Sequence, residues 1–445
     1  MNKKNTANYI FENDRVTFKS FLSEFSSELF EEFDLRAKKI GLDSKIEDLF
    51  NGEKVNYTEG LAALHPRCRD KYVPDEFNAS LGDDKKSEYE LWSMFFDTKN
   101  IVVIGIGGSL EGPKMLIEFL ASSDPDKNFI FITGSDDTEF SSKTVGLNPD
   151  DTIFFVSSKS FTTEETLANL RDAISWSGDI AKFIAITANA SEAKKYNIKN
   201  VIEIDQEIGG RYSIWSDISI VPKWYSPEDF DAFMAGGKQA DIDLKTDESY
   251  KKFVKALAYS DIWLHNFKNK NTRAVLSYIW NLRSFPKYIQ QLEMESLGKQ
   301  PSIDSEFKKT GQIIFGGYGP TAQHSYFQLL HQGTQDVCVD IVMGSPDRRA
   351  KECRTLAYAQ AITQSKLLSS ELESALKDEE NINGNVPTNL FEIDSGDLYP
   401  LGYLIATWEH RTYITAAILG INPFDQFGVN MGKSYTKKYF NEHGD

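Results

Sequence analysis

The feature of the sequence that most limits its fold is a series of short apolar runs that alternate with helix-favouring segments. Runs of this length are typical of strands that are buried on both faces of a sheet. Because helix-favouring residues such as 164–176 separate the later runs, we predict a parallel sheet covered by helices on both faces. The predicted strands are residues 101–104, 128–133, 152–156, 183–187 and 200–204.

A second series of the same kind follows along the chain. Apolar runs at residues 274–278, 312–315 and 337–343 alternate with helix-favouring segments at 287–293 and 349–376. The order of strand and helix repeats that of the first series. We therefore predict a second α/β domain that is related to the first.

Helical patterns flank and join the two series. Apolar residues recur at helical spacing over residues 14–40, and a further helix is expected over residues 401–419. The predicted organisation is an N-terminal helical segment (1–79), a first α/β domain (80–230), a helical linker (231–248), a second α/β domain (249–400) and a C-terminal helical segment (401–445).

Composition limits the class of protein. The 445 residues are 40% hydrophobic and 26% charged, which is typical of a soluble globular protein. The net charge of −17 argues against a general affinity for nucleic acid or an anionic membrane, so an anionic ligand needs a local positive site.

The cysteines and the chain start indicate the compartment. Cys68, Cys338 and Cys353 are widely spaced and lack a paired metal-ligand spacing, which suits a reducing environment without zinc or disulfides. The first residues contain no apolar signal core, and no run approaches membrane-spanning length. We expect a cytoplasmic protein.

The loop after the third apolar run is rich in hydroxyl side chains. Ser158, Lys159, Ser160 and Thr163 lie between the predicted strand and a helix that begins at Glu164. Hydroxyls and backbone N–H groups at a helix N-terminus suit a phosphate dianion. An ordinary capped helix explains the same residues, because Ser and Thr are common N-cap residues, so both interpretations stay open.

The first apolar run ends in a glycine turn, Gly-Ile-Gly-Gly-Ser at residues 105–109. Leu110 stands where the dinucleotide fingerprint needs its last glycine, so a nicotinamide cofactor is weakly supported. Gly108 and Ser109 offer N–H groups and a hydroxyl to sugar oxygens, although a tight strand-to-helix turn explains the glycines almost as well. Ligands of parallel sheets bind beyond the carboxyl ends of the strands, so this turn and the hydroxyl-rich loop should meet.

Three residues carry side chains suited to acid–base chemistry or charge stabilisation. Arg211 follows two glycines and offers a permanent positive fork that suits an enolate or carboxylate oxygen, or else it stacks on Tyr212 or Trp215. Glu295 precedes a glycine turn, and His324 lies at a helix start. Most such Glu are solvated and most such His are structural, so the pattern alone leaves their roles open.

Positions near the two ends of the chain are less specific. His65 and Arg67 are interpreted as the end of a surface helix, because Pro66 follows the apolar stretch. Near the C-terminus, a loop bracketed by Pro and Gly presents Gln426, and Lys433 lies on the following helix. A Lys in a Lys-rich helix is normally a solvated charge.

Six stretches of the chain form an ordered set: residues 105–109, 158–166, 209–216, 294–299, 323–334, and 422–426 with 432–433. Together they resemble the motifs of the glucose-6-phosphate isomerase family, in the family's order. The resemblance extends from about residue 56 to residue 433. It implies two sugar-isomerase (SIS-type) domains, each an αβα sandwich, and reversible interconversion of glucose 6-phosphate and fructose 6-phosphate without metal or cofactor.

The resemblance also implies which residues contact the substrate. The phosphate hydroxyls would be Ser158, Ser160 and Thr163, with Lys159 beside them, and the sugar contacts would be Gly108, Ser109 and Gln426.

Catalytic roles are implied in the same way. Glu295 resembles the base that takes the proton from C2 and returns it to C1, and Arg211 steadies the enediolate between these steps. His324 and Lys433 resemble the pair that opens and closes the sugar ring, with Glu165 orienting His324. In the family this His comes from the second subunit. The resemblance thus implies a homodimer with His324 supplied across the interface, and no nucleic-acid or membrane partner.

The chain departs from the family's pattern in two places near the expected sugar pocket. Leu297 stands where a polar Asn is usual, and residues 317–320 read Gly-Tyr-Gly-Pro in place of Glu-Pro-Gly-Thr. An isomerase that also accepts mannose 6-phosphate is therefore an alternative. A non-catalytic sugar-phosphate sensor is another, but it would need only the hydroxyl-rich loop and not the four catalytic residue types.

Overall fold

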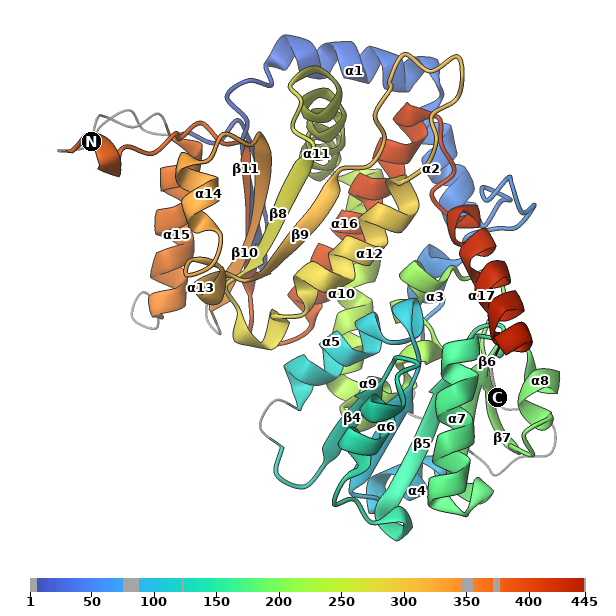
Figure 1. Ribbon diagram of the computed structural model, residues 1–445. Helices are drawn as coiled ribbons and strands as arrows, with labels where there is room; N and C mark the ends of the chain where they lie inside the picture. Colours follow the sequence, from blue (N-terminus) through green and yellow to red (C-terminus); the bar gives the residue numbers. More distant parts are fainter. Residues whose placement is uncertain (1–5, 75–87, 122–123, 346–354, 371–376, 444–445) are drawn as a thin grey trace.

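The computed structural model describes residues 6–74, 88–121, 124–345, 355–370 and 377–443 of the chain (Figure 1). Its strands form two separate sheets, each covered by helices. The predicted fold class, with two mainly parallel sheets in αβα sandwiches, is confirmed. Among the described helices, none is both long enough and apolar enough to cross a bilayer.

The first sheet is parallel throughout and has the order β4-β3-β5-β6-β7. All five predicted strands are present. They are β3 (Asn100–Ile104), β4 (Asn128–Ile132), β5 (Thr152–Ser157), β6 (Phe183–Thr187) and β7 (Asn200–Glu203). The chain winds in one direction from β3 to β4 and in the other from β5 to β7, which creates a switch point between β3 and β5 where ligands of such sheets bind.

Alternate side chains of the first sheet enter two separate cores. Val102 and Phe154 pack on one face with Leu170 of α7 (Glu164–Ser177). Ile101 and Phe155 pack on the other face, with residues of α4 (Glu88–Asp97) and α9 (Ile220–Tyr225). Because both faces are buried, the strands need apolar residues at every position, which explains why their sequence runs are uninterrupted.

The second sheet has the order β1-β2-β11-β10-β8-β9. Four of its strands are parallel: β8 (Thr272–Ser277), β9 (Ile313–Tyr318), β10 (Val337–Ser345) and β11 (Thr388–Asp394). Strand β8 lies between β9 and β10, just as β3 lies between β4 and β5, so the two sheets share a winding order. Strand β11 was not predicted.

The predicted helix over residues 14–40 is wrong in its first part. Residues Val16–Phe21 form β2, which pairs antiparallel with β11 and with β1 (Tyr9–Glu12). The helix α1 begins later, at Ser27–Lys39, where the Ser26 side chain accepts a hydrogen bond from the Leu29 backbone N–H. Short apolar segments fit both a helical and a strand period, and here pairing with the sheet edge decided the outcome.

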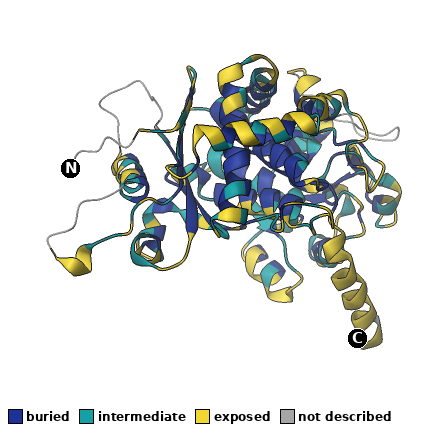
Figure 2. Ribbon diagram, turned by 90° about the horizontal axis from the view of Figure 1, so that it is seen from above, coloured by how far each residue is buried: buried dark blue, intermediate teal, exposed yellow. Residues whose placement is uncertain are grey.

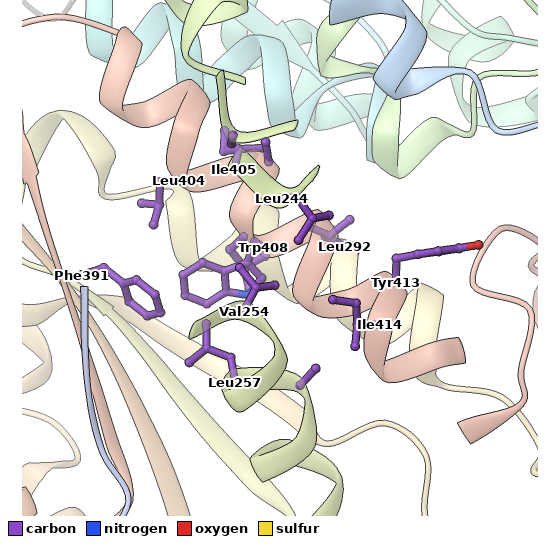
Figure 3. Packing of buried hydrophobic residues seen from close by; sticks show 14 of the residues in the cluster. Leu244, Val254, Leu257, Leu292, Phe391, Leu404, Ile405, Trp408, Tyr413 and Ile414 are labelled. Atoms are coloured by element: carbon purple, nitrogen blue, oxygen red, sulfur yellow. The ribbon is translucent and has the colours of Figure 1, made fainter. Parts of the chain in front are cut away.

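Three long helices lie between the sheets: α10 (Pro227–Thr246), α12 (Phe285–Leu297) and α16 (Tyr399–Leu419) (Figure 1). A fourth, α11 (Glu248–Phe267), packs against α16 and α10 beside the second sheet. Figure 3 shows Trp408 of α16 among Val254, Leu257, Leu292 and Phe391. Helix α16 is buried around its circumference, and it forms the centre of the core.

The segment predicted as a linker, residues 231–248, lies mostly within α10. A Cβ atom at Gly236 would lie 1.9 Å from the Tyr399 carbonyl oxygen, and one at Gly402 would lie 2.0 Å from that of Phe233. The glycines therefore allow α10 and α16 to touch along their backbones. This segment is packed core, and the boundaries between domains stay a prediction.

The remaining helices include α2 (Leu42–Asn51), α3 (His65–Asp70), α5 (Glu111–Leu120), α13 (Gly319–Ala322), α14 (Phe327–Gln332), α15 (Leu356–Ser369) and α17 (Asn430–His443). The predicted helix over 349–376 is observed as α15, and its two ends, like Cys353, lie outside the described residues. Cys68 and Cys338 are free thiols. Figure 2 shows α17 projecting from the body with exposed residues along its length.

Candidate active site

An arginine and a glutamate form the centre of the candidate site. Arg211 lies in the 3₁₀ helix η4 (Gly210–Trp215), and Glu295 lies in the last turn of α12. Arg211 Nη1 is 2.7 Å from Glu295 Oε2, and the side chains are 3% and 35% exposed. The guanidinium is therefore held inside the protein, while the carboxylate remains accessible to a bound molecule.

Further contacts fix the position of Arg211. Its Nη2 donates to the backbone carbonyl oxygens of Phe424, at 3.0 Å, and Asp425, at 2.6 Å. The alternative that Arg211 stacks on Trp215 is not observed, because the cation over that ring, at 4.5 Å from its centroid, is Arg69. A buried guanidinium with most of its donors occupied is a rigid positive group.

The glycine turn after β3 packs directly against η4. A Cβ atom at Gly108 would lie 1.9 Å from the carbonyl oxygen of Gly210, so the two backbones are in direct contact. Ser213 Oγ donates to the carbonyl oxygens of Gly108, at 3.2 Å, and Gly210, at 2.7 Å. Ser109 follows Gly108 in the 3₁₀ helix η1 (Gly107–Ser109). Gly108 is therefore needed for this close packing, because any side chain would collide with η4. The lack of a side chain also leaves its backbone uncovered near Arg211.

The hydroxyl-rich loop follows β5, and the last residue of that strand lies beside the glycine turn, while a contact between the loop and the turn stays a prediction. A Cβ atom at Gly105 would lie 3.2 Å from the carbonyl oxygen of Ser157. Ser158 Oγ is 3.1 Å from Thr163 Oγ1, and Thr162 Oγ1 donates to Ser160 Oγ at 2.8 Å. Both hydroxyl pairs lie at the switch point of the first sheet.

The start of α7 distinguishes the two interpretations of this loop. Thr163 is the N-cap residue of α7, yet within the described chain its side chain makes no capping hydrogen bond and pairs with Ser158 instead. The capped-helix interpretation is therefore not what is observed. The first N–H groups of a 14-residue helix remain for an anion, where the helix dipole favours negative charge.

Phe161 anchors the loop. Its φ of 52° lies in the left-handed region, which costs a non-glycine residue about 1–3 kcal/mol. Its ring is buried in the core beneath the first sheet, and burial of a Phe side chain contributes a similar stabilisation of about 1.5–3 kcal/mol. The buried ring directs the neighbouring Ser160 and Thr162 hydroxyls to the surface.

Lys159 is half-buried between Ser158 and Ser160. Burial lowers the pKa of Lys159, Glu59 and Asp205 act in the opposite direction, and the positive charge of Arg211 lowers it further. The loop and the Arg211–Glu295 pair thus share one electrostatic environment. An anion bound at the loop would favour the charged form of this lysine.

The C-terminal loop closes the other side of Arg211. Asp425 accepts a hydrogen bond from Lys299 Nζ at 2.7 Å and one from Thr58 Oγ1 at 2.7 Å. Asn422 Nδ2 donates to Thr58 Oγ1 at 2.6 Å and to Asn56 Oδ1 at 2.8 Å. Three segments far apart in the sequence are thereby joined. The motifs contained Lys299 and Asp425, but neither was assigned a role, and the part of residues 56–58 was missed.

Gln426 and Lys433 follow that loop. Arg211 Nη1 is 3.5 Å from Gln426 Oε1, so Gln426 is at the edge of the cluster. Lys433 is exposed on α17 and makes no ion pair with a described residue, whereas Lys437 Nζ is 3.2 Å from Glu164 Oε1. Residues four apart share a helix face, so Lys433 lies on the side of α17 that faces the start of α7.

His324 and Glu165 are not brought together in one chain. His324 is exposed after α13, and Glu165 is in the first turn of α7. Figure 1 shows α13 and α7 beside different sheets. No side-chain hydrogen bond or ion pair reaches His324 from the part of the chain that the structure describes.

His65 was assigned to a surface helix end, and this prediction is wrong. The residue is buried at the start of α3, and its ring stacks on Tyr212, with centroids 4.4 Å apart and planes at 26°. Burial lowers the pKa of His65 well below its usual value, so the ring is neutral. Helix α3 is covered by other parts of the chain, which its local sequence does not reveal.

Residues 86–444 match the sequence model of the family described as phosphoglucose isomerase. The chain belongs to this family. Two relatives are the glucose-6-phosphate isomerases of Shewanella sp. strain MR-4 and Shewanella oneidensis, each 34% identical over 449 residues, with 89% of this chain and 82% of the relative covered.

One solved structure agrees with the phosphoglucose isomerase assignment, and a second shows the same fold. The crystal structure of a glucose-6-phosphate isomerase from Chlamydia trachomatis superposes with a TM-score of 0.83 at 25% identity, covering 98% of this chain and 90% of that chain. A hypothetical protein from Thermus thermophilus superposes with a TM-score of 0.71 at 20% identity, covering 95% and 99%, and shares the fold. All twelve predicted site residues of this phosphoglucose isomerase family member lie within residues 86–444.

Proposed function

We propose that the chain catalyses the reversible isomerisation of glucose 6-phosphate and fructose 6-phosphate. The Arg211–Glu295 pair carries this proposal: an accessible carboxylate lies 2.7 Å from a buried, fixed guanidinium beside the hydroxyl-rich loop. Transfer of a proton next to a carbonyl needs a positioned base and a positive partner for the oxygen that gains charge. The two side chains meet these two needs.

In the proposed reaction, the Glu295 carboxylate takes the proton from C2 of the open-chain aldose. The electron pair of that C–H bond forms the C1–C2 double bond, and the C1 oxygen gains the charge. A proton passes from the C2 hydroxyl to the C1 oxygen, which leaves the charge on the C2 oxygen. Glu295 then returns its proton to C1, the C1–C2 double bond supplies the electron pair of the new C–H bond, and the C2 oxygen becomes the carbonyl. Arg211 stabilises the enediolate, and such electrostatic stabilisation is worth about 10²–10³ in rate.

The phosphate group is assigned to the loop after β5. Ser158, Ser160 and Thr163 would donate hydroxyl hydrogen bonds, together with N–H groups of the first turn of α7. Lys159 would supply a positive charge beside them, and Gly108, Ser109 and Gln426 would contact the sugar. The absence of a capping bond at Thr163 within the described residues supports this assignment.

Ring opening is assigned to His324 and Lys433, with Glu165 orienting His324, in a homodimer. His324 would enter the site from the second copy, because within one chain the described contacts do not join it to Glu165.

A second copy would also cover α17, where Met431, Tyr435 and Tyr439 are 68%, 65% and 68% exposed. These residues recur every fourth position, on the face opposite Lys433, and a 14-residue helix is marginal without packing. The free thiols and the acidic charge support a cytoplasmic enzyme.

Turnover of glucose 6-phosphate by the purified protein, with and without chelator, tests the proposed function. We expect Glu295→Gln to reduce kcat by about 10²–10⁴-fold while substrate binding remains, because the amide cannot accept the proton. Glu306→Gln is the matched control, since Glu306 pairs with Arg36 on the surface. Activity of Glu295→Gln within tenfold of the wild type would remove Glu295 from this role, and loss of wild-type activity with chelator would indicate a metal.

A further inference from the structure

A second side-chain pair lies directly beside the Arg211–Glu295 pair. Tyr212 follows Arg211 in η4, and Ser296 follows Glu295 in α12. The Tyr212 hydroxyl is 2.9 Å from Ser296 Oγ. Consecutive residues of η4 therefore contact consecutive residues of α12, through one ion pair and one hydrogen bond.

The second pair is enclosed on all sides. Tyr212 is 1% exposed and Ser296 is 0% exposed. The Tyr212 ring stacks on His65, and it also packs against Phe424, with centroids 5.4 Å apart. The carbonyl of Phe424 is itself an acceptor for Arg211. Tyr212 thus contacts both the element that bears the base and the loop that holds the guanidinium.

The protonation state of Tyr212 does not vary over the pH range in which an enzyme works. Burial raises the pKa of Tyr212 well above its usual value, so the hydroxyl keeps its proton. The pair with Ser296 is therefore a neutral hydrogen bond at every working pH, whereas the Arg211–Glu295 contact must change when Glu295 takes a proton.

We propose that Tyr212 and Ser296 are positioning residues, which fix the last turn of α12 and so align the Glu295 carboxylate with the substrate. Successive residues of an α-helix point in directions about 100° apart. The middle of α12 is held by Glu293, which accepts hydrogen bonds from Arg273 and Trp408. The contacts at positions 295 and 296 restrain its last turn in two further directions. The inference rests on the proposed isomerase activity.

The alignment matters most during the reaction. When Glu295 takes the proton, its ion pair with Arg211 loses the negative partner, and the fixed guanidinium then pairs with the enediolate. The Tyr212–Ser296 hydrogen bond persists through this step and holds the protonated carboxyl between C2 and C1. A misplacement of about 1 Å in such a site costs about 10²-fold in rate.

The test is a double-mutant cycle with Tyr212→Phe and Ser296→Ala, which each remove one hydroxyl and keep most of the packing. We expect each variant to lower kcat about tenfold or more, with KM changed less than about threefold. The double variant should match the single variants, because all three lack the same bond. Either single variant breaks the bond, so a variant that does not fold leaves the other as the test.

Tyr250→Phe is the matched control. The Tyr250 hydroxyl is 2.8 Å from Thr407 Oγ1 in the core between α11 and α16, away from Glu295. We expect this control to lower the melting temperature as Tyr212→Phe does, but to keep kcat within twofold of the wild type.

The outcomes separate the inference from the function on which it rests. If the wild type turns over and Tyr212→Phe and Ser296→Ala keep kcat within twofold, the inference is overturned. An equal loss of kcat in Tyr250→Phe also overturns it, because the effect would then follow stability. If the wild type itself shows no turnover, the proposed function fails, and the inference fails with it.

Discussion

The two sheets share one winding order but keep their polar side chains in different places. In the first sheet, strands β3, β4, β5 and β6 contain no charged residue, and the one charged residue of β7, Glu203, is exposed. Polar groups gather in the loops at the carboxyl ends of β3 and β5. In the second sheet, charged residues lie inside: Arg273 on β8 and Asp340 on β10 are 1% and 0% exposed.

The buried charges of the second sheet join it to the central helices. Arg273 Nη1 donates to Glu293 Oε1 of α12 at 3.0 Å. Arg411 of α16 contacts Asp261 of α11 at 2.6 Å and Asp340 at 2.8 Å. Each buried charge has an opposite partner, as a low-dielectric interior requires.

The difference indicates that polar groups serve ligand binding in the first sheet and structural stability in the second. Polar groups at an open edge remain available to a ligand and cost little stability when removed. Polar groups in a closed network hold elements together, and removal of one partner leaves a buried charge uncompensated. Glu293 is two residues before Glu295, so the second sheet also holds the helix that bears the proposed base.

The largest expected effect on stability comes from breaking the closed network. Arg411→Met should lower the free energy of unfolding by about 3–5 kcal/mol, because Asp261 and Asp340 then lack their main partner. Arg36→Met is the control, since its pair with Glu306 is on the surface and such pairs contribute about 1 kcal/mol or less. Urea denaturation measures both. Equal losses of unfolding free energy in the two variants would show that the closed network contributes no more than a surface ion pair.

An intermediate effect is expected at the open edge of the first sheet. Ser160→Ala combined with Thr163→Ala should raise KM for the sugar phosphate by tenfold or more, because each hydrogen bond to a charged group contributes about 1.5–3 kcal/mol. The free energy of unfolding should change by less than about 1 kcal/mol. A large loss of stability with unchanged KM would mean that the loop has a structural function.

The smallest expected effect is a loss of stability at acidic pH that depends on His265. Burial, together with the positive charges of Lys309 and Arg273, lowers the pKa of His265 from 6.5 to about 4. In the unfolded chain His265 is protonated below about pH 6.5, whereas in the folded chain it is protonated only below about pH 4. The free energy of unfolding therefore falls as the pH decreases through this interval. Because the side chain is not fully enclosed, we expect a change on the order of 1 kcal/mol.

The comparison of His265→Gln with the wild type at pH 7 and pH 5 measures that effect. The variant should lose less stability between the two values, because one titrating group is gone. An identical pH dependence in the two proteins would show that other groups, such as the buried His410, account for the acid sensitivity.

Sequence patterns predicted the first sheet best because its strands are apolar on both faces, so residues such as 101–104 and 152–156 could not be mistaken for surface segments. Prediction was weaker at Val16–Phe21, where Phe18, Phe21 and Leu22 have helical spacing although Val16 and Phe18 alternate as in a strand, and at β11, which was not recognised. His65 was placed at the surface because nothing local to it indicates the elements that cover it.

The candidate site shows the same limit. Motif order identified Arg211 and Glu295 as partners by resemblance, but the roles of Thr58, Lys299 and Asp425 depend on contacts between residues 126 and 367 positions apart. Such contacts follow from the packing of whole elements.

By itself, the sequence determined the strand–helix alternation, the glycine turn, the hydroxyl-rich loop and the family to which the chain belongs. Tertiary structure alone decided that Arg211 is buried against Glu295 and that Tyr212 meets Ser296. The physical reason is that local propensity acts over a few residues, whereas these hydrogen bonds form only when distant elements exclude water together.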